Sequence, residues 1–213
     1  MRVAADRSRK IFLAACCGGL LLPLASLAAD SSAPVQAGWK TQEIRYSYTG
    51  FTTAYDCDAA EDRIKAILRA LGAHEQTRVS AQGCMLNRPS RNFFITITTA
   101  TPVPASELSK TPGQASRDEL LKRLGVASSK LDQTFPAEWK TVALSRDRKL
   151  DLQPGDCELM QGLRDHVLPK LSVKIEADRV QCVPRQLSIQ TPELTVSALV
   201  PVASPDTPAD KPS

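Results

Sequence analysis

The chain has 213 residues, with 27 Lys and Arg against 23 Asp and Glu and a formal net charge of +4. Residues 1–29 hold four of those basic residues and one of the acidic ones, so the rest of the chain carries 23 against 22. The excess positive charge therefore belongs to the first 29 residues. Because no cluster of Lys or Arg remains beyond them, we expect no binding of nucleic acid.

Residues 1–29 have the pattern of a secretory signal peptide. Basic residues precede an apolar run over 11–24, and small residues follow it up to Asp30. The run contains two glycines and a proline, and it is shorter than the roughly 20 apolar residues of a bilayer span. A lipoprotein-type box also ends at Cys16, but it lies before most of the apolar run. We expect cleavage after Ala28 or Ala29, a periplasmic or secreted protein, and no membrane span in the mature chain.

The first half beyond the signal opens with a segment, 30–37, that has little to bury and is predicted to be disordered. A strand is predicted over 42–48, because apolar residues alternate with polar ones. Helical spacing of apolar residues predicts a helix over 58–73, with Asp58 and Glu61 as its capping box. Two further strands follow, about 77–83 and 92–101.

The second half repeats this order of elements. Between the halves, a spacer at 104–138 contains a short predicted helix over 116–125 with a capping box at Ser116 and Glu119. Val142-Ala143-Leu144 is predicted to begin a strand, and a helix follows that Pro169 should kink or end early. Two strands are predicted at about 173–182 and 193–200, and a disordered tail at 203–213.

The two halves also share residues at a nearly constant offset. An offset of 100 pairs Trp39-Lys40-Thr41 with Trp139-Lys140-Thr141, and Asp56-Cys57 with Asp156-Cys157. Pro102-Val103 falls opposite Pro201-Val202 at an offset of 99. We interpret this as duplication of a unit of about 65 residues, with copies at 39–103 and 139–202; chance similarity is the alternative. The predicted fold is α+β, with two tandem β-α-β-β repeats packed as one pseudo-symmetric domain.

Four cysteines lie beyond the signal: Cys57, Cys84, Cys157 and Cys182. An even number in an exported chain predicts structural disulfides. A duplicated unit that once existed singly could close only its own pair, so we expect Cys57–Cys84 and Cys157–Cys182. Each bridge would contribute about 3 to 4 kcal/mol by restricting the unfolded chain. Because no Cys-x-x-Cys motif or zinc-ligand spacing occurs, no metal or cofactor is expected.

Two strings resemble a family of small exported proteobacterial proteins that has no assigned activity. The first is Gly50-Phe51-Thr52-Thr53-Ala54-Tyr55-Asp56-Cys57, followed by Leu71-Gly72-Ala73 and Cys84. The second is Gly155-Asp156-Cys157-Glu158-Leu159, followed by Leu168-Pro169 and Cys182. The resemblance covers about residues 39–184, and it implies no functional residue.

Catalytic motifs are missing from the sequence. Beyond the signal the chain has only His74 and His166, at non-equivalent positions of the two halves, where an exposed or capping role explains them. There is no Gly-x-Ser-x-Gly elbow, phosphate-binding glycine loop or His-Glu-x-x-His motif. The sequence therefore predicts no catalytic residue.

The aromatic residues are distributed unequally between the halves. Tyr46, Tyr48, Phe51 and Tyr55 fall within ten residues of the first half, where the second half has Arg146, Arg148, Asp151 and Gly155. One hypothesis is that these four aromatic residues form a binding face. The alternative is that Tyr46 and Tyr48 pack under the helix, while Leu150 and Leu152 compensate in the second half.

Three arginines bracket the Cys84 loop: Arg78, Arg88 and Arg91. They could hold an anionic group, although solubility alone would explain them.

The predicted function is a non-enzymatic binding or accessory module of the cell envelope, which presents the loop Gly50 to Asp56 to a protein partner. One alternative is a small hydrolase with a site between the repeats. The other is a secreted enzyme inhibitor that presents a rigid loop.

Overall fold

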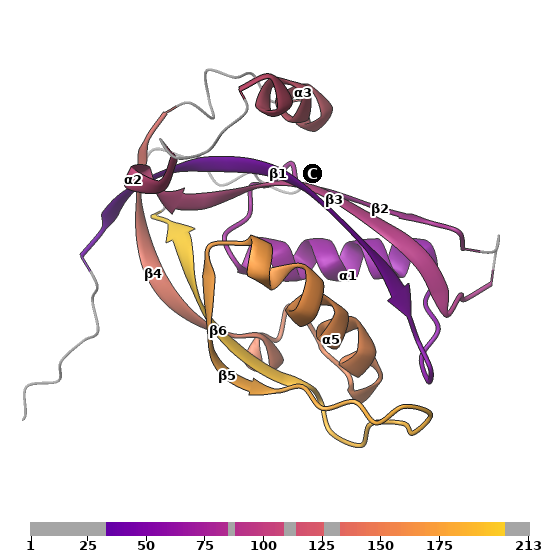
Figure 1. The fold of residues 1–213 in the computed structure, drawn as a ribbon. Coiled ribbons are helices and arrows are strands. Elements are labelled where there is room, and N and C mark those ends of the chain that lie inside the picture. Colours follow the sequence, from indigo (N-terminus) through magenta and orange to yellow (C-terminus); the bar gives the residue numbers. More distant parts are fainter. Residues whose placement is uncertain (1–32, 85–87, 109–113, 126–132, 203–213) are drawn as a thin grey trace, which may run out of the picture. The chain divides into compact units, whose positions relative to one another are not determined.

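The computed structural model describes residues 33–84, 88–108, 114–125 and 133–202. The predicted signal peptide at 1–29 and the tail at 203–213 lie outside these residues. The described chain forms one antiparallel sheet of six strands in the order β2-β3-β1-β4-β6-β5 (Figure 1). The strands are β1 (Val35–Thr49), β2 (Arg78–Gln82), β3 (Asn92–Pro104), β4 (Phe135–Ala143), β5 (Val173–Arg179) and β6 (Glu193–Pro201).

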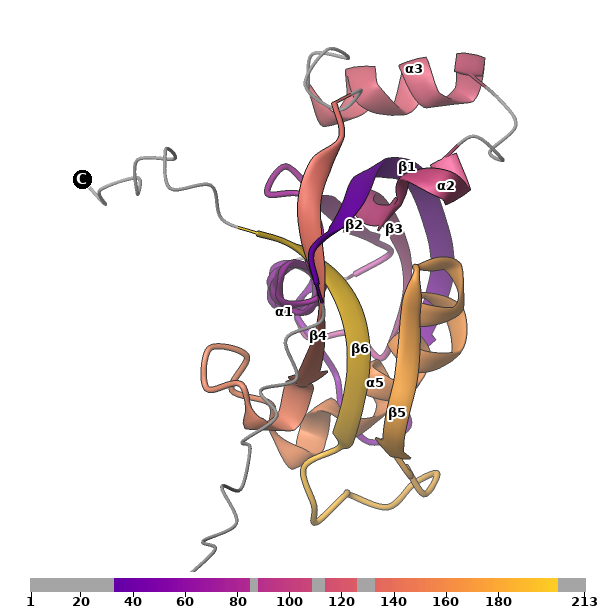
Figure 2. The same cartoon turned by 90° about the vertical axis from the view of Figure 1, so that its left-hand side faces the viewer.

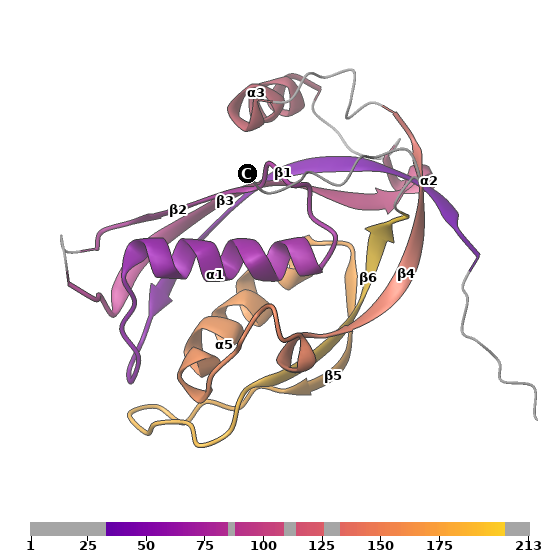
Figure 3. The same ribbon diagram turned by 180° about the vertical axis from the view of Figure 1, so that it is seen from behind.

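Helices α1 (Cys57–Ala70) and α5 (Cys157–His166) lie on the same face of the sheet (Figures 1 and 3). Their apolar sides share one core with the strands, in which Ile64 of α1, Leu163 of α5 and Ile95 of β3 are all buried. The short helix α2 (Ala105–Leu108) follows β3. Helix α3 (Gln114–Leu124) lies on the opposite face, where Leu121 and Leu124 pack on Ala100. The α+β class predicted from the sequence is confirmed.

Both predicted disulfides are present, Cys57–Cys84 and Cys157–Cys182. In each pair the first cysteine begins a helix and the second follows a strand by two or three residues. Each bridge therefore joins a helix to the sheet.

The sheet extends further than the apolar pattern predicts. Strand β1 begins at Val35 and Ala37 is fully buried, so the prediction of disorder over 30–37 is wrong for its last residues. The backbone of residues 35–37 pairs with residues 135–137 of β4, a contact between distant parts of the chain that local composition does not reveal. For the same reason β4 begins inside the predicted spacer. It ends at Ala143, and Leu144 begins a 3-10 turn, Leu144–Arg146, instead of extending a strand.

The predicted capping box of α1 is also wrong. The N-cap residue is Asp56, whose side chain caps no backbone group. Glu61 accepts a hydrogen bond from the Ala81 backbone N–H at 2.7 Å instead, so its carboxylate joins α1 to β2. The effect predicted for Pro169 is confirmed, because α5 ends at His166 and the proline lies in a 3-10 turn, Leu168–Lys170.

The order strand, helix, strand, strand occurs in both halves, and the register between β1 and β4 is symmetric. Val35 pairs with Ala137, Gln36 with Pro136 and Ala37 with Phe135. If each residue is replaced by its equivalent 100 positions away in the other strand, the same set of pairs results. The β1–β3 and β4–β6 registers correct one detail of the sequence comparison. Ala37 pairs with Pro104 and Ala137 with Pro201, so Pro104, and not Pro102, is the structural counterpart of Pro201.

Candidate functional site

The loop after β1 is held on the first turn of α5 by a carboxylate. The backbone N–H groups of residues 51–53 donate hydrogen bonds to Glu158 at 3.0 to 3.2 Å. Successive N–H groups that converge in this way form a concave site for an anion. Because Glu158 is in the first turn of α5, its charge also interacts favourably with the helix dipole. The loop is thereby fixed to the second half of the molecule.

A second polar contact joins the same two segments. The Tyr55 hydroxyl donates to Asp156 Oδ1 at 2.5 Å, and Asp156 Oδ2 accepts from the Gln153 backbone N–H at 2.7 Å. Arg63 Nη1 lies 3.8 Å from the same buried carboxylate. Burial, and next the hydrogen bond to Asp156, raise the pKa of Tyr55 well above its ordinary value, so the phenol remains a donor. The two strings that carry the family resemblance thus contact each other.

Of the four predicted binding residues, Tyr46 and Tyr48 are buried in the core. Tyr46 stacks on His166 with ring centroids 5.9 Å apart, and a Cβ at Gly162 would come within 3.3 Å of its ring. Both residues are therefore part of the core, as the alternative prediction has it, but the helix against which Tyr46 packs is α5 of the other half. Leu150 and Leu152 are buried in the same core.

Tyr48 donates a hydrogen bond to the Thr53 carbonyl at 3.0 Å and packs on Phe93 and Tyr55. Tyr55 is partly buried, so Phe51 is the one exposed member of the four, with 51% of its surface accessible. Of the predicted aromatic face, Phe51 alone is exposed. Tyr48 and Tyr55 instead hold the loop in place through their hydrogen bonds to the Thr53 carbonyl and to Asp156.

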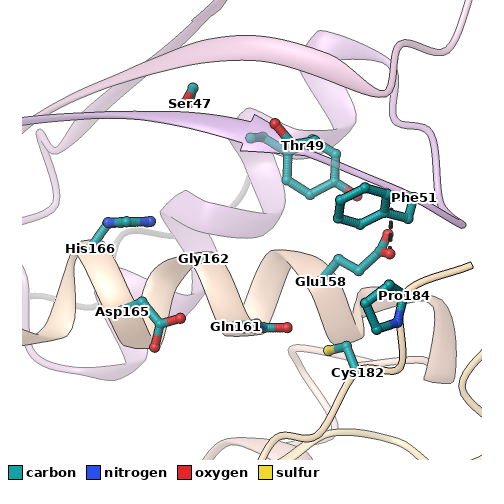
Figure 4. Close-up of a pocket in the computed structure, with 11 residues that line it drawn as sticks. Ser47, Thr49, Phe51, Glu158, Gln161, Gly162, Asp165, His166, Cys182 and Pro184 are labelled. Atoms are coloured by element: carbon teal, nitrogen blue, oxygen red, sulfur yellow. Dashed lines mark hydrogen bonds between the residues drawn. The ribbon is translucent and has the colours of Figure 1, made fainter.

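A pocket of about 350 Å³ lies beside this junction (Figure 4). The side chains that could take part in chemistry there are Glu158, Asp165 and His166. Ser47 and Thr49 also line the pocket, but they alternate along β1 with the buried Tyr46 and Tyr48, so their side chains point to the other face of the sheet. Glu158 and Asp165 are seven residues apart on one helix, about 10 Å along its axis. Figure 4 shows Glu158 turned toward Phe51, away from Asp165. The pocket therefore lacks a pair of convergent carboxylates.

An apolar loop that the sequence reasoning missed lies next to this pocket. The connection from β5 to β6 extends beyond the ends of both strands (Figures 1 and 2). It carries Val183, Leu187 and Ile189, with 57%, 69% and 88% of their surfaces accessible, around a hollow of about 490 Å³. Pro184 of the same connection lines the pocket with Phe51. The sequence shows that these residues are apolar, but it does not show that their side chains remain exposed, because exposure depends on which other element packs over them.

The arginines predicted to bracket the Cys84 loop do not gather at one pocket. Arg78 lines a hollow of about 590 Å³ together with Lys65 and Arg69, and neither Arg88 nor Arg91 lines it. Among the described residues, no group of three His, Cys, Asp or Glu is placed to hold a metal ion. None of the helices in the described ranges is long and apolar enough to cross a membrane.

Comparison with protein-family models, with curated proteins and with solved structures gives no match. The resemblance to an exported proteobacterial family therefore stays a prediction.

Proposed function

We propose that this protein is an exported, non-enzymatic binding module that captures an apolar segment of an envelope or secreted protein. The observation that carries the proposal is the apolar surface of Val183, Leu187 and Ile189 around one hollow, together with Phe51, which lines the adjacent pocket with Pro184 of the same connection. The accessible fractions of these four side chains run from 51% to 88%. Large apolar side chains that gather on a surface mark sites of association, because water solvates them poorly. Four of the six large apolar side chains exposed in the described chain belong to this surface.

The surface is supported by rigid elements. The Cys157–Cys182 bridge anchors the base of the β5–β6 connection to α5, immediately before Val183. Glu158 fixes the backbone on either side of Thr52. A binding surface that is ordered before association loses less conformational entropy when its partner binds. The two disulfides also indicate an oxidising compartment outside the cytoplasm, where such a partner would be met.

The test is selection of random peptides on the purified, disulfide-bonded protein, followed by affinity measurements on variants. We expect apolar peptides to be enriched, and the double substitution Leu187→Ser with Ile189→Ser to weaken them at least about tenfold. The matched control is Ile175→Ser, because Ile175 is 46% exposed on β5, outside the proposed surface. Equal affinity for the double variant and the wild type would refute the proposal.

An inhibitor of a secreted enzyme is a second candidate, favoured by one observation. The β5–β6 connection is an exposed loop closed at its base by a disulfide, as loops that enter an enzyme cleft often are. The sequence had suggested a different loop, residues 50–56, as the one presented to a partner. Peptide selection separates the two candidates, since an inhibitory loop would select no apolar peptide.

We also infer that the two halves arose by tandem duplication. The inference is supported by the shared order of elements, by the two equivalent disulfides, and by the β1–β4 register that is symmetric at an offset of 100. The β5–β6 connection, which holds Cys182, corresponds in this comparison to the β2–β3 connection, which holds Cys84.

A further inference from the structure

We propose that the outer face of strands β2, β3 and β1 binds an acidic saccharide. This face is opposite the one that α1 and α5 cover. The strand register places Gln82, Phe94 and Ser47 in one row across the three strands, and Ser80, Thr96 and Arg45 in the next row.

The burial pattern shows that both rows face outward. Val79 and Ile95, the neighbours in sequence of Ser80 and Phe94, are buried in the core. Successive side chains of a strand point to opposite faces. The residues of the two rows are accordingly exposed or only half-buried, and they line a hollow of about 650 Å³.

Phe94 supplies a flat platform in this hollow. Its ring is 70% exposed, so it contributes little to the core. The face of an aromatic ring is electronegative and attracts the weakly positive C–H groups on the apolar side of a sugar ring. The side chains around it are hydroxyls and an amide, which can both donate to and accept from sugar hydroxyls. An apolar protein segment would find no such match, because Phe94 has no exposed apolar neighbour in the two rows.

The guanidinium of Arg45 favours an acidic sugar over a neutral one. Arg45 and Arg123 both pair with the carboxylate of Glu43, at 2.5 and 2.6 Å, and Arg123 also pairs with Glu119 at 3.3 Å. Arg45 is the one charged residue of the two rows, and its side chain remains 70% accessible. A guanidinium has five N–H donors, so the single carboxylate that pairs with Arg45 leaves donors for a second anion. A carboxylate, sulfate or phosphate on the sugar ring would accept hydrogen bonds from these donors.

The size and the compartment favour a saccharide over single-stranded nucleic acid. Two rows on three strands span about 7 by 10 Å, enough for about one or two sugar rings. Binding of single-stranded nucleic acid commonly uses aromatic residues for successive bases. These rows contain one aromatic residue, and the disulfides indicate an oxidising compartment outside the cytoplasm, away from the cell's own nucleic acid.

The test is calorimetric titration of the purified, disulfide-bonded protein with three probes of similar length: an oligogalacturonate, a neutral malto-oligosaccharide and a single-stranded oligonucleotide. We expect the oligogalacturonate to bind most tightly. Phe94→Leu keeps an apolar side chain but removes the flat ring, and should weaken binding about tenfold. Arg45→Gln should lower the affinity for the acidic probe toward that for the neutral one.

Phe51→Leu is the matched control, because Phe51 is an exposed aromatic residue outside the two rows. It should leave the affinity for the oligogalacturonate unchanged. Three results would overturn the proposal: no binding of the oligogalacturonate, equal binding by wild type and the Phe94 variant, or tighter binding of the oligonucleotide. Since Phe94 is exposed, its variant should melt at the wild-type temperature. The result is independent of the peptide-binding surface, which shares no residue with this face.

Discussion

The Tyr46 hydroxyl is an exception to the rule that buried polar groups are hydrogen-bonded. It lies in the core against α5, and no hydrogen-bond partner is found for it among the described residues. A buried polar atom without a partner loses its interactions with water and gains nothing in return. Tyr48, two residues away on the same face, shows the contrast, since its hydroxyl donates to the Thr53 carbonyl.

This difference gives a prediction for two matched substitutions. Tyr46→Phe should raise the free energy of unfolding by about 1 kcal/mol, because it removes a hydroxyl that makes no hydrogen bond. Tyr48→Phe should lower it by about 1 kcal/mol, because the Thr53 carbonyl loses its donor. Chemical denaturation of both variants measures these values. The interpretation of Tyr46 is wrong if both substitutions destabilise the protein equally.

At the scale of elements, Glu158 joins the loop after β1 to α5. Three consecutive N–H groups point at one carboxylate, and hydrogen bonds to a charged acceptor are stronger than neutral ones. The interaction links residues more than a hundred positions apart, so it contributes to holding the two halves together. It also orders the backbone that carries Phe51 of the proposed binding surface.

Glu158→Gln should therefore lower the free energy of unfolding by about 1 to 2 kcal/mol and weaken the capture of apolar peptides. Asp165→Asn is the matched control on the same helix. Its exposed carboxylate pairs with the neighbouring Arg164, so the expected loss is below about 0.5 kcal/mol. Equal losses in denaturant unfolding for the two variants would contradict the role given to Glu158.

At the scale of the whole molecule, all three tyrosines lie at or near the junction of the halves. Burial is the largest cause that raises the pKa of each, and for Tyr55 the hydrogen bond to Asp156 adds to it. The folded protein therefore keeps three phenols protonated at a pH where the unfolded chain releases their protons. Because the unfolded chain then binds fewer protons, the stability of the fold decreases as the pH rises.

The loss should begin near the ordinary tyrosine pKa of about 10 and continue above it. Ultraviolet absorbance of phenolate and circular dichroism, recorded together during an alkaline titration, measure ionisation and unfolding on one sample. We expect phenolate to form only as the fold is lost. Ionisation of any tyrosine at about pH 10 in the folded protein would contradict the burial described above.

Local pattern was sufficient for α1, α3, α5 and most of the strands. The apolar spacing of α1 predicts its buried side, and Ile64, Ile67 and Leu68 are all buried. The disulfide pairing was predicted because a duplicated unit can close only its own pair. The ends of β1 and β4 were not predicted, since they depend on pairing between residues 35–37 and 135–137.

The sequence by itself determined an α+β chain with two helices that each carry a disulfide-bonded cysteine, because helical periodicity, strand alternation and cysteine spacing are local properties. Only the tertiary structure decided which side chains are exposed. It buried Tyr46 and Tyr48, placed Tyr55 on Asp156, and left Ile189 and Phe94 accessible. Exposure depends on which distant segment packs over a residue, and these segments lie about a hundred residues apart in the chain. The candidate surfaces therefore emerged from the packing of the two halves.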